Sequence, residues 1–187
     1  MIKVKLIFFV SVLTLVGCKK DIFDANNNLG GCTDIDAINF NNEADFEDNS
    51  CLYAYIQEYE ISYYPDENPN SSIPFVDSWD IPGTGADADL LLKIKHQDSS
   101  SYLFVSPIME NQSANSPAYW PAQENYKLVN KTYYWELYDN DATNSNEFID
   151  SGSFNPISIA INNKITVHGN HLPSNSTQLV IHYALGD

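Results

Sequence analysis

The fold is indicated first by the stretch Tyr133-Tyr134-Trp135-Glu136-Leu137-Tyr138. Aromatic residues favour β-strands, and this run holds four of them without glycine or proline. A second run that reads as a strand is Leu90-Leu91-Leu92-Lys93-Ile94-Lys95. Both runs border loops rich in aspartate and asparagine, which are residues that turns prefer. The two stretches therefore predict β-strands.

Further stretches on both sides of these two runs also have the composition of β-strands. The predicted strands cover residues 52–64, 88–96, 102–107, 126–129, 132–138, 157–161, 164–168 and 178–184. Asn162-Asn163 is typical of a tight hairpin turn. No ten-residue stretch after residue 30 shows a helical period. We predict an all-β fold, an antiparallel β-sandwich of about eight strands over residues 52–187.

The N-terminus has the pattern of an export signal. Lys3 and Lys5 precede an apolar run over 6–16, and Gly17 stands before Cys18. The apolar run is shorter than the roughly 20 residues that a transmembrane helix needs. We predict a signal peptide over 1–17, and the alternatives are a signal peptide with a chance cysteine or a buried helix.

The four residues that end at Cys18 carry a resemblance of their own. Leu15-Val16-Gly17-Cys18 resembles the bacterial lipobox, which implies cleavage before Cys18 and its lipidation. Residues 18–30 are polar and predict a flexible tether. The chain is then expected in the bacterial cell envelope, held through its lipid in the outer membrane, on a side that the sequence leaves open.

Two further cysteines bound a short segment over residues 31–51. If Cys18 carries lipid, Cys32 and Cys51 remain as a pair, and an oxidising compartment favours a disulfide. Free or metal-bound thiols are the alternative. The segment resembles a short Cys-bounded repeat of secreted and surface proteins, starting Gly31-Cys32-Thr33-Asp34. Its Asp and Asn side chains suit either a calcium ion or turn capping, and a minicore of Ile38, Phe40 and Phe46 is expected.

Carboxylates are concentrated in two loops beside predicted strands. The first loop runs from 77 to 89, and the second from 138 to 150. Crowded carboxylates repel one another, and a cation relieves that repulsion. Calcium takes six to eight oxygen ligands from Asp, Glu, Asn and backbone carbonyls. The two loops therefore predict a calcium site, and solvated turn acids are the alternative reading.

These loops resemble the calcium-binding loops of C2 domains. The resemblance implies a C2-like sandwich and assigns ligand roles to Asp80, Asp89, Asp139, Asp141 and Glu147, with Asn144 as a further oxygen donor. The sequence departs from the family in a longer gap between the first two acids and in Glu at 147. A proline is missing after Asp89, and Asp150 stands where the family has glycine.

Charge and motifs limit the function classes. The chain has 9 Lys and Arg against 25 Asp and Glu, a net charge of −16, so nucleic acid is excluded as a partner. Direct docking of the sandwich on phospholipid is not favoured. The chain lacks the hydrolase, phosphate-loop and zinc-protease motifs, so no enzymatic activity is expected. We expect a calcium-binding envelope module for adhesion or structure, with a protein or glycan ligand. Its rivals are a hydrolase or carbohydrate-active protein using the same acids, and a metal-free structural domain.

Overall fold

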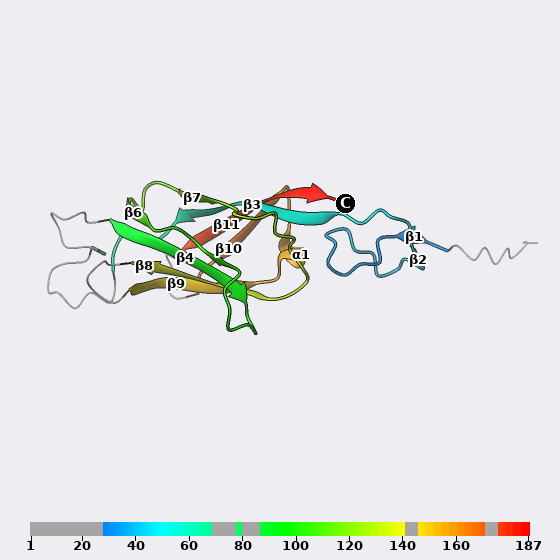
Figure 1. The fold of residues 1–187 in the computed structure, drawn as a ribbon, viewed down its shortest axis with the longest axis horizontal. Helices are drawn as coiled ribbons and strands as arrows, with labels where there is room; N and C mark the ends of the chain where they lie inside the picture. The colour runs from blue at the N-terminus through cyan, green and yellow to red at the C-terminus, as the bar shows by residue number, and fades with distance from the viewer. Residues whose placement is uncertain (1–27, 69–77, 80–86, 141–145, 171–175) are drawn as a thin grey trace, which may run out of the picture.

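The structure, a computed structural model, describes residues 28–68, 78–79, 87–140, 146–170 and 176–187. Its body consists of two antiparallel sheets packed face to face (Figure 1). The predicted all-β class and the antiparallel sandwich are therefore confirmed. The signal peptide, Cys18 and most of the tether lie outside the described residues. Within the described part of the chain, no helix is long and apolar enough to cross a membrane.

The first sheet has the order β10-β11-β3-β7. Its strands are β3 (Tyr53–Tyr63), β7 (Ala118–Pro121), β10 (Lys164–His168) and β11 (Gln178–Gly186). The pairing of β3 with β11 extends from Tyr63 opposite Gln178 to Tyr53 opposite Gly186. Valine, isoleucine and tyrosine recur in these strands, and such side chains fit a half-buried pleated surface.

The second sheet has the order β5-β4-β8-β9, with β6 also pairing with β4. Its strands are β4 (Ala88–His96), β5 (Phe104–Val105), β6 (Met109–Gln112), β8 (Tyr133–Asp139) and β9 (Glu147–Phe154). Residues 133, 135, 137 and 139 of β8 are buried and alternate with half-buried ones. This period of two assigns one face of the sheet to the core.

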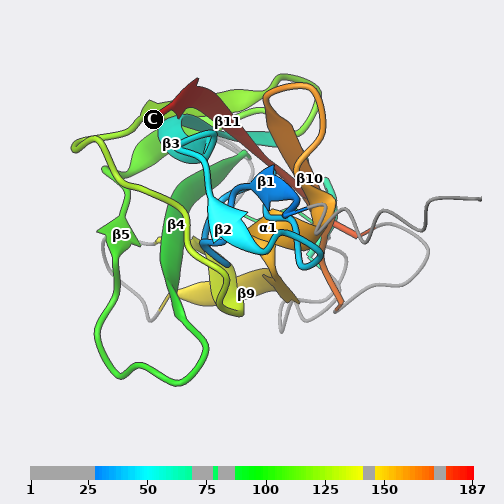
Figure 2. The same ribbon diagram turned by 90° about the vertical axis from the view of Figure 1, so that its right-hand side faces the viewer.

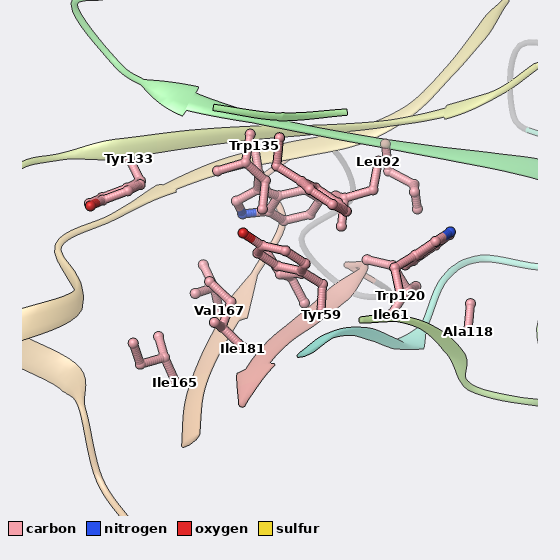
Figure 3. Close-up of a cluster of buried hydrophobic side chains, with 14 of the residues drawn as sticks. Tyr59, Ile61, Leu92, Ala118, Trp120, Tyr133, Trp135, Ile165, Val167 and Ile181 are labelled. Atoms are coloured by element: carbon pink, nitrogen blue, oxygen red, sulfur yellow. The ribbon is translucent and has the colours of Figure 1, made fainter. Parts of the chain in front are cut away.

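The core lies between the sheets. Figure 3 shows Leu92 and Trp135 of the second sheet pointing toward Tyr59, Val167 and Ile181 of the first. Trp135 and Leu92 are fully buried. Burial of such apolar side chains is the main favourable contribution to the fold, at roughly 1.5–3 kcal/mol each.

The segment over 31–51 packs against one end of the sandwich, where α1 also lies (Figure 2). It contains β1 (Gly30–Gly31) and β2 (Phe46–Glu47), and Cys32 and Cys51 form the predicted disulfide. The expected minicore is wrong in part, because Phe40 and Phe46 are exposed. The segment instead buries Cys32 and Ala37, and Ile38 packs on the core of the sandwich.

The predicted strand over 157–161 is also wrong, because the chain forms the short helix α1 (Pro156–Ile159) there. The Asn155 side chain accepts a hydrogen bond from the Ile157 amide, and Pro156 occupies the first turn. An N-cap followed by proline starts a helix despite the β-branched residues that follow. The hairpin turn is confirmed, since Asn162 and Asn163 both have positive φ between bridged Ile161 and Lys164.

Candidate metal site at the acidic end of the sandwich

Three neighbouring strands bring predicted ligands to one end of the second sheet. Asp89 is the second residue of β4, Asp139 is the last of β8, and Glu147 is the first of β9. Asp139 lies opposite Leu90 on one side and opposite Glu147 on the other. In Figure 1 the starts of β4 and β9 lie at the end of the sandwich away from β1 and β2. Asp80, Asp141 and Asn144 lie outside the described residues.

Asp139 is a carboxylate in a core position. It continues the inward-facing series of β8 after Trp135 and Leu137, and its exposed fraction is 0%. Its Oδ1 accepts a hydrogen bond from the Asp89 amide at 2.6 Å. Buried charges in proteins are paired or coordinate metals, because removing a carboxylate from water is costly. The position of Asp139 therefore suits a ligand of a cation at the mouth of the sandwich.

Glu147 on β9 lies directly opposite Asp139 on β8. Residues directly opposite each other on antiparallel strands point to the same face, so both carboxylates lie on the core side of the sheet. Glu147 also accepts a hydrogen bond from the side-chain Nδ2 of Asn68, a residue that is buried. Asn68 was not predicted from the sequence, because the surrounding Asp-Glu-Asn-Pro-Asn run reads as an ordinary turn.

The side chain of Asp89 turns away from this pair. Leu90 shares the core face with Asp139, so its neighbour Asp89 projects from the other face. The Oδ1 of Asp89 accepts a hydrogen bond from the Asn111 amide at 2.7 Å. The backbone of Asp89, through its amide to Asp139 and its carbonyl to Asn140, is the part that meets the acidic end.

Further negative charge acts on the same end. Burial raises the pKa of Tyr64, and the carboxylates of Asp87, Asp66 and Asp139 raise it further. The Tyr64 hydroxyl donates to the carbonyl of Gln112. The carboxylates of Asp66, Asp87 and Asp139 thus act on one tyrosine that follows β3, and Glu147 lies opposite Asp139. Such a concentration lowers the electrostatic potential there and favours a cation.

The Cys-bounded segment has a second group of potential metal-ligand residues. Within the described residues, Cys32, Glu47 and Cys51 form the only group of three or more His, Cys, Asp or Glu side chains whose ligand atoms all lie within 4.8 Å of one another. The two cysteines form a disulfide, so they offer no thiolate to a metal. Glu47 accepts hydrogen bonds from the amides of Thr33 and Asn49. Through these hydrogen bonds, Glu47 holds two parts of its own segment together. The alternative of metal-bound thiols is wrong, because the two cysteines are bonded to each other.

No protein-family model and no curated protein matches this chain. Solved structures that are similar include one described as a C2 domain, with a TM-score of 0.43 and 13% identity over 73% of this chain and 99% of that one. The calcium-bound pair of C2 domains from extended-synaptotagmin 2 has a TM-score of 0.36 and 12% identity, and the match covers 71% of this chain and 44% of that one. Human GIVD cytosolic phospholipase A2 has a TM-score of 0.39 and 9% identity, and the match covers 72% of this chain but only 15% of the phospholipase.

Two of these three structures are described as C2 domains. At TM-scores below 0.5 and identities of 13% or less, the similarities assign neither a family nor a function to the chain.

Proposed function

We propose that this chain is a lipid-anchored protein of the bacterial cell envelope whose β-sandwich binds a calcium ion at its acidic end and serves as a binding or structural module. The observation that carries the proposal is the fully buried carboxylate of Asp139, paired in register with Glu147. A calcium ion held by these two residues, and by Asp80, Asp141 and Asn144 of the adjoining loops, would neutralise charge that the core otherwise disfavours. Asp89 would contribute through its backbone.

The arrangement of the ends supports membrane attachment through Cys18 rather than through the sandwich. The described chain begins two residues before β1, and β1 lies at the end of the sandwich away from the starts of β4 and β9 (Figure 1). A lipid on Cys18 would therefore hold the acidic end away from the anchoring bilayer. The proposed partner of that end is a protein or glycan outside the membrane, and the proposed role is binding without catalysis.

Thermal unfolding of the mature chain in chelator and in calcium tests the site. Extracellular calcium modules bind at roughly 10⁻⁴–10⁻³ M. At a calcium concentration of about 100 times Kd, binding to the folded state stabilises it by about 2.7 kcal/mol. We therefore expect Tm to rise by several degrees at roughly 10–100 mM calcium, which is 100 times those Kd values, and less in magnesium, which prefers stricter octahedral geometry.

Two variants connect the shift to the site. Asp139→Asn keeps an acceptor for the Asp89 amide but removes the buried charge, so it should lose the calcium shift without losing stability in chelator. Glu147→Gln should weaken calcium binding. Asp98→Asn, beyond the other end of β4, makes the same charge change and should keep the shift. A wild-type Tm that does not change with calcium, or a calcium-induced Tm rise in Asp139→Asn equal to that of the wild type, would contradict the proposed site.

A further inference from the structure

The outer face of the second sheet carries a distinct group of side chains. Tyr134, Glu136 and Tyr138 are the residues of β8 that point away from the core. Lys95 lies opposite Tyr134 and Lys93 lies opposite Glu136 on β4. Tyr102 reaches the same face from the segment before β5, where its hydroxyl donates to Glu136 at 2.7 Å. We call these six residues the tyrosine–lysine face.

The members of this face hold one another in place. The Lys93 Nζ lies 4.7 Å from the ring centroid of Tyr138 and 5.7 Å from that of Tyr102. The Lys95 Nζ lies 5.6 Å from the ring of Tyr134 and 5.7 Å from that of Tyr102. Ammonium groups over aromatic rings are attracted by the negative ring face. The face is therefore ordered before any ligand arrives, which lowers the entropy cost of binding.

The charge of the face is unlike that of the rest of the protein. The chain has no arginine, and residues 28–187 contain five lysines, namely Lys93, Lys95, Lys127, Lys131 and Lys164. Two of the five lie side by side on this face, against one acid, Glu136. Because the chain carries a net charge of −16, an anionic polymer is repelled over most of the surface and attracted here.

From these observations we infer that the tyrosine–lysine face docks a carboxylated polysaccharide, a glycan chain that contains uronic acids. Tyrosine rings stack on the C–H faces of pyranose rings, and an ammonium group pairs with a uronate carboxylate. Glu136 and the tyrosine hydroxyls offer hydrogen bonds to sugar hydroxyls. Four residues of strand separate Tyr134 from Tyr138, about 14 Å, so the face accommodates a chain better than a single sugar.

Other ligand classes fit the face less well. A nucleic acid carries too dense a charge for a protein with so few cations. An anionic bilayer is recognised by clusters of about four or more cationic side chains, whereas this face carries Lys93 and Lys95 beside an acid, Glu136. The inferred site is separate from the proposed calcium site, since it lies on the outer face and needs no metal. The two proposals can therefore fail independently.

The test measures binding of the mature chain to polygalacturonate by calorimetry in chelator, so that no calcium bridges the polymer. Dextran is the neutral comparison, and vesicles of phosphatidylserine and phosphatidylcholine test a lipid ligand. We expect binding to polygalacturonate alone, weakened by added salt. Tyr134→Ala and Lys95→Gln should each weaken it about tenfold, because one such contact contributes about 1.4 kcal/mol.

Two matched controls make the same chemical changes elsewhere. Tyr119→Ala removes an exposed tyrosine of β7 in the other sheet, and Lys164→Gln removes an exposed lysine of β10. Both should bind polygalacturonate as the wild type does. Binding to vesicles without binding to polygalacturonate, equal binding to dextran, or equal losses in the control variants would overturn the inference.

Discussion

Gly169 lies against the carboxylate of Asp150, so that a Cβ atom at position 169 would overlap the Asp150 Oδ2. Asp150 is fully buried in β9, and its Oδ2 accepts a hydrogen bond from the Thr177 amide at 2.9 Å. The Gly169 amide donates to the carbonyl of Thr177 at 2.8 Å. Asp150 stands where the C2 loops have glycine. Its side chain thus joins β9 to Thr177, which precedes β11 and is hydrogen-bonded to Gly169 after β10.

We predict that Gly169→Ala lowers the free energy of unfolding by about 1–3 kcal/mol, the usual cost of overpacking a buried site. The φ of Gly169 is outside the left-handed region, so the cost is steric alone. Thermal melting measures it, with Ser153→Ala on the exposed side of β9 as the control. If the clash is with Asp150, adding Asp150→Ala to Gly169→Ala must cost less than Asp150→Ala costs in the wild type.

A second prediction concerns the hydrogen bond from the Tyr53 hydroxyl to the Asp34 Oδ2, 2.7 Å, which joins the Cys-bounded segment to β3. The backbone amide of Asp36 and then this hydroxyl hold the pKa of Asp34 below its ordinary value of 3.8. The same bond raises the pKa of Tyr53 to about 12. Tyr53→Phe should therefore raise the pKa of Asp34 toward 3.8, followed by NMR of the carboxyl carbon, whereas Tyr55→Phe should not.

The direction of the pH dependence follows from these shifts. The Asp34 pKa is depressed on folding, so its contribution is present above 3.8 and is lost as the pH falls through the lower folded value. The Tyr53 pKa is raised, so its contribution is present below 10.0 and is lost as the pH rises through about 12. The attachment of the segment should therefore be strongest between those limits. An Asp34 pKa that is the same in Tyr53→Phe would contradict this account.

The sequence predicted the strands whose own residues decide their structure. Ala88–His96 and Lys164–His168 form strands with the predicted bounds, because apolar and β-branched residues recur in them without a breaker. Ala118–Pro121 ends in proline, and Glu147–Phe154 contains Ser-Gly-Ser, so neither reads as a strand alone. They become strands because an existing sheet edge offers hydrogen bonds to their backbones, which is a tertiary effect that propensity does not contain.

The candidate site was predictable to a similar extent. Asp139 and Glu147 flank one loop between adjacent strands, so their proximity follows from a hairpin connection. The side-chain direction of Asp89 could not be predicted in this way, because a shift of one residue in the pairing of a strand exchanges its two faces. The contact of Asn68 with Glu147 joins residues 79 positions apart, and no local pattern encodes it.

The last prediction concerns reduction of the Cys32–Cys51 disulfide. The bridge closes a loop of 19 residues, for which chain entropy predicts a contribution of about 3 kcal/mol. The segment meets the sandwich through few hydrogen bonds, among them the Ile38 amide to the Leu52 carbonyl and the Asn130 amide to Asp36. Reduction should therefore loosen the segment locally and leave the two sheets folded.

Hydrogen exchange distinguishes local from global loss. The amide of Asn41, bonded to the carbonyl of Cys32 at 2.8 Å, should exchange roughly a hundredfold faster after reduction. The amide of Leu92, bonded to the hydroxyl of Ser106 within the core, should keep its rate. The double variant Cys32→Ser and Cys51→Ser should show the fast Asn41 rate without reductant and no response to it. Equal acceleration at Leu92 would mean that the sandwich depends on the bridge, because the segment and the sheets would then unfold as one cooperative unit.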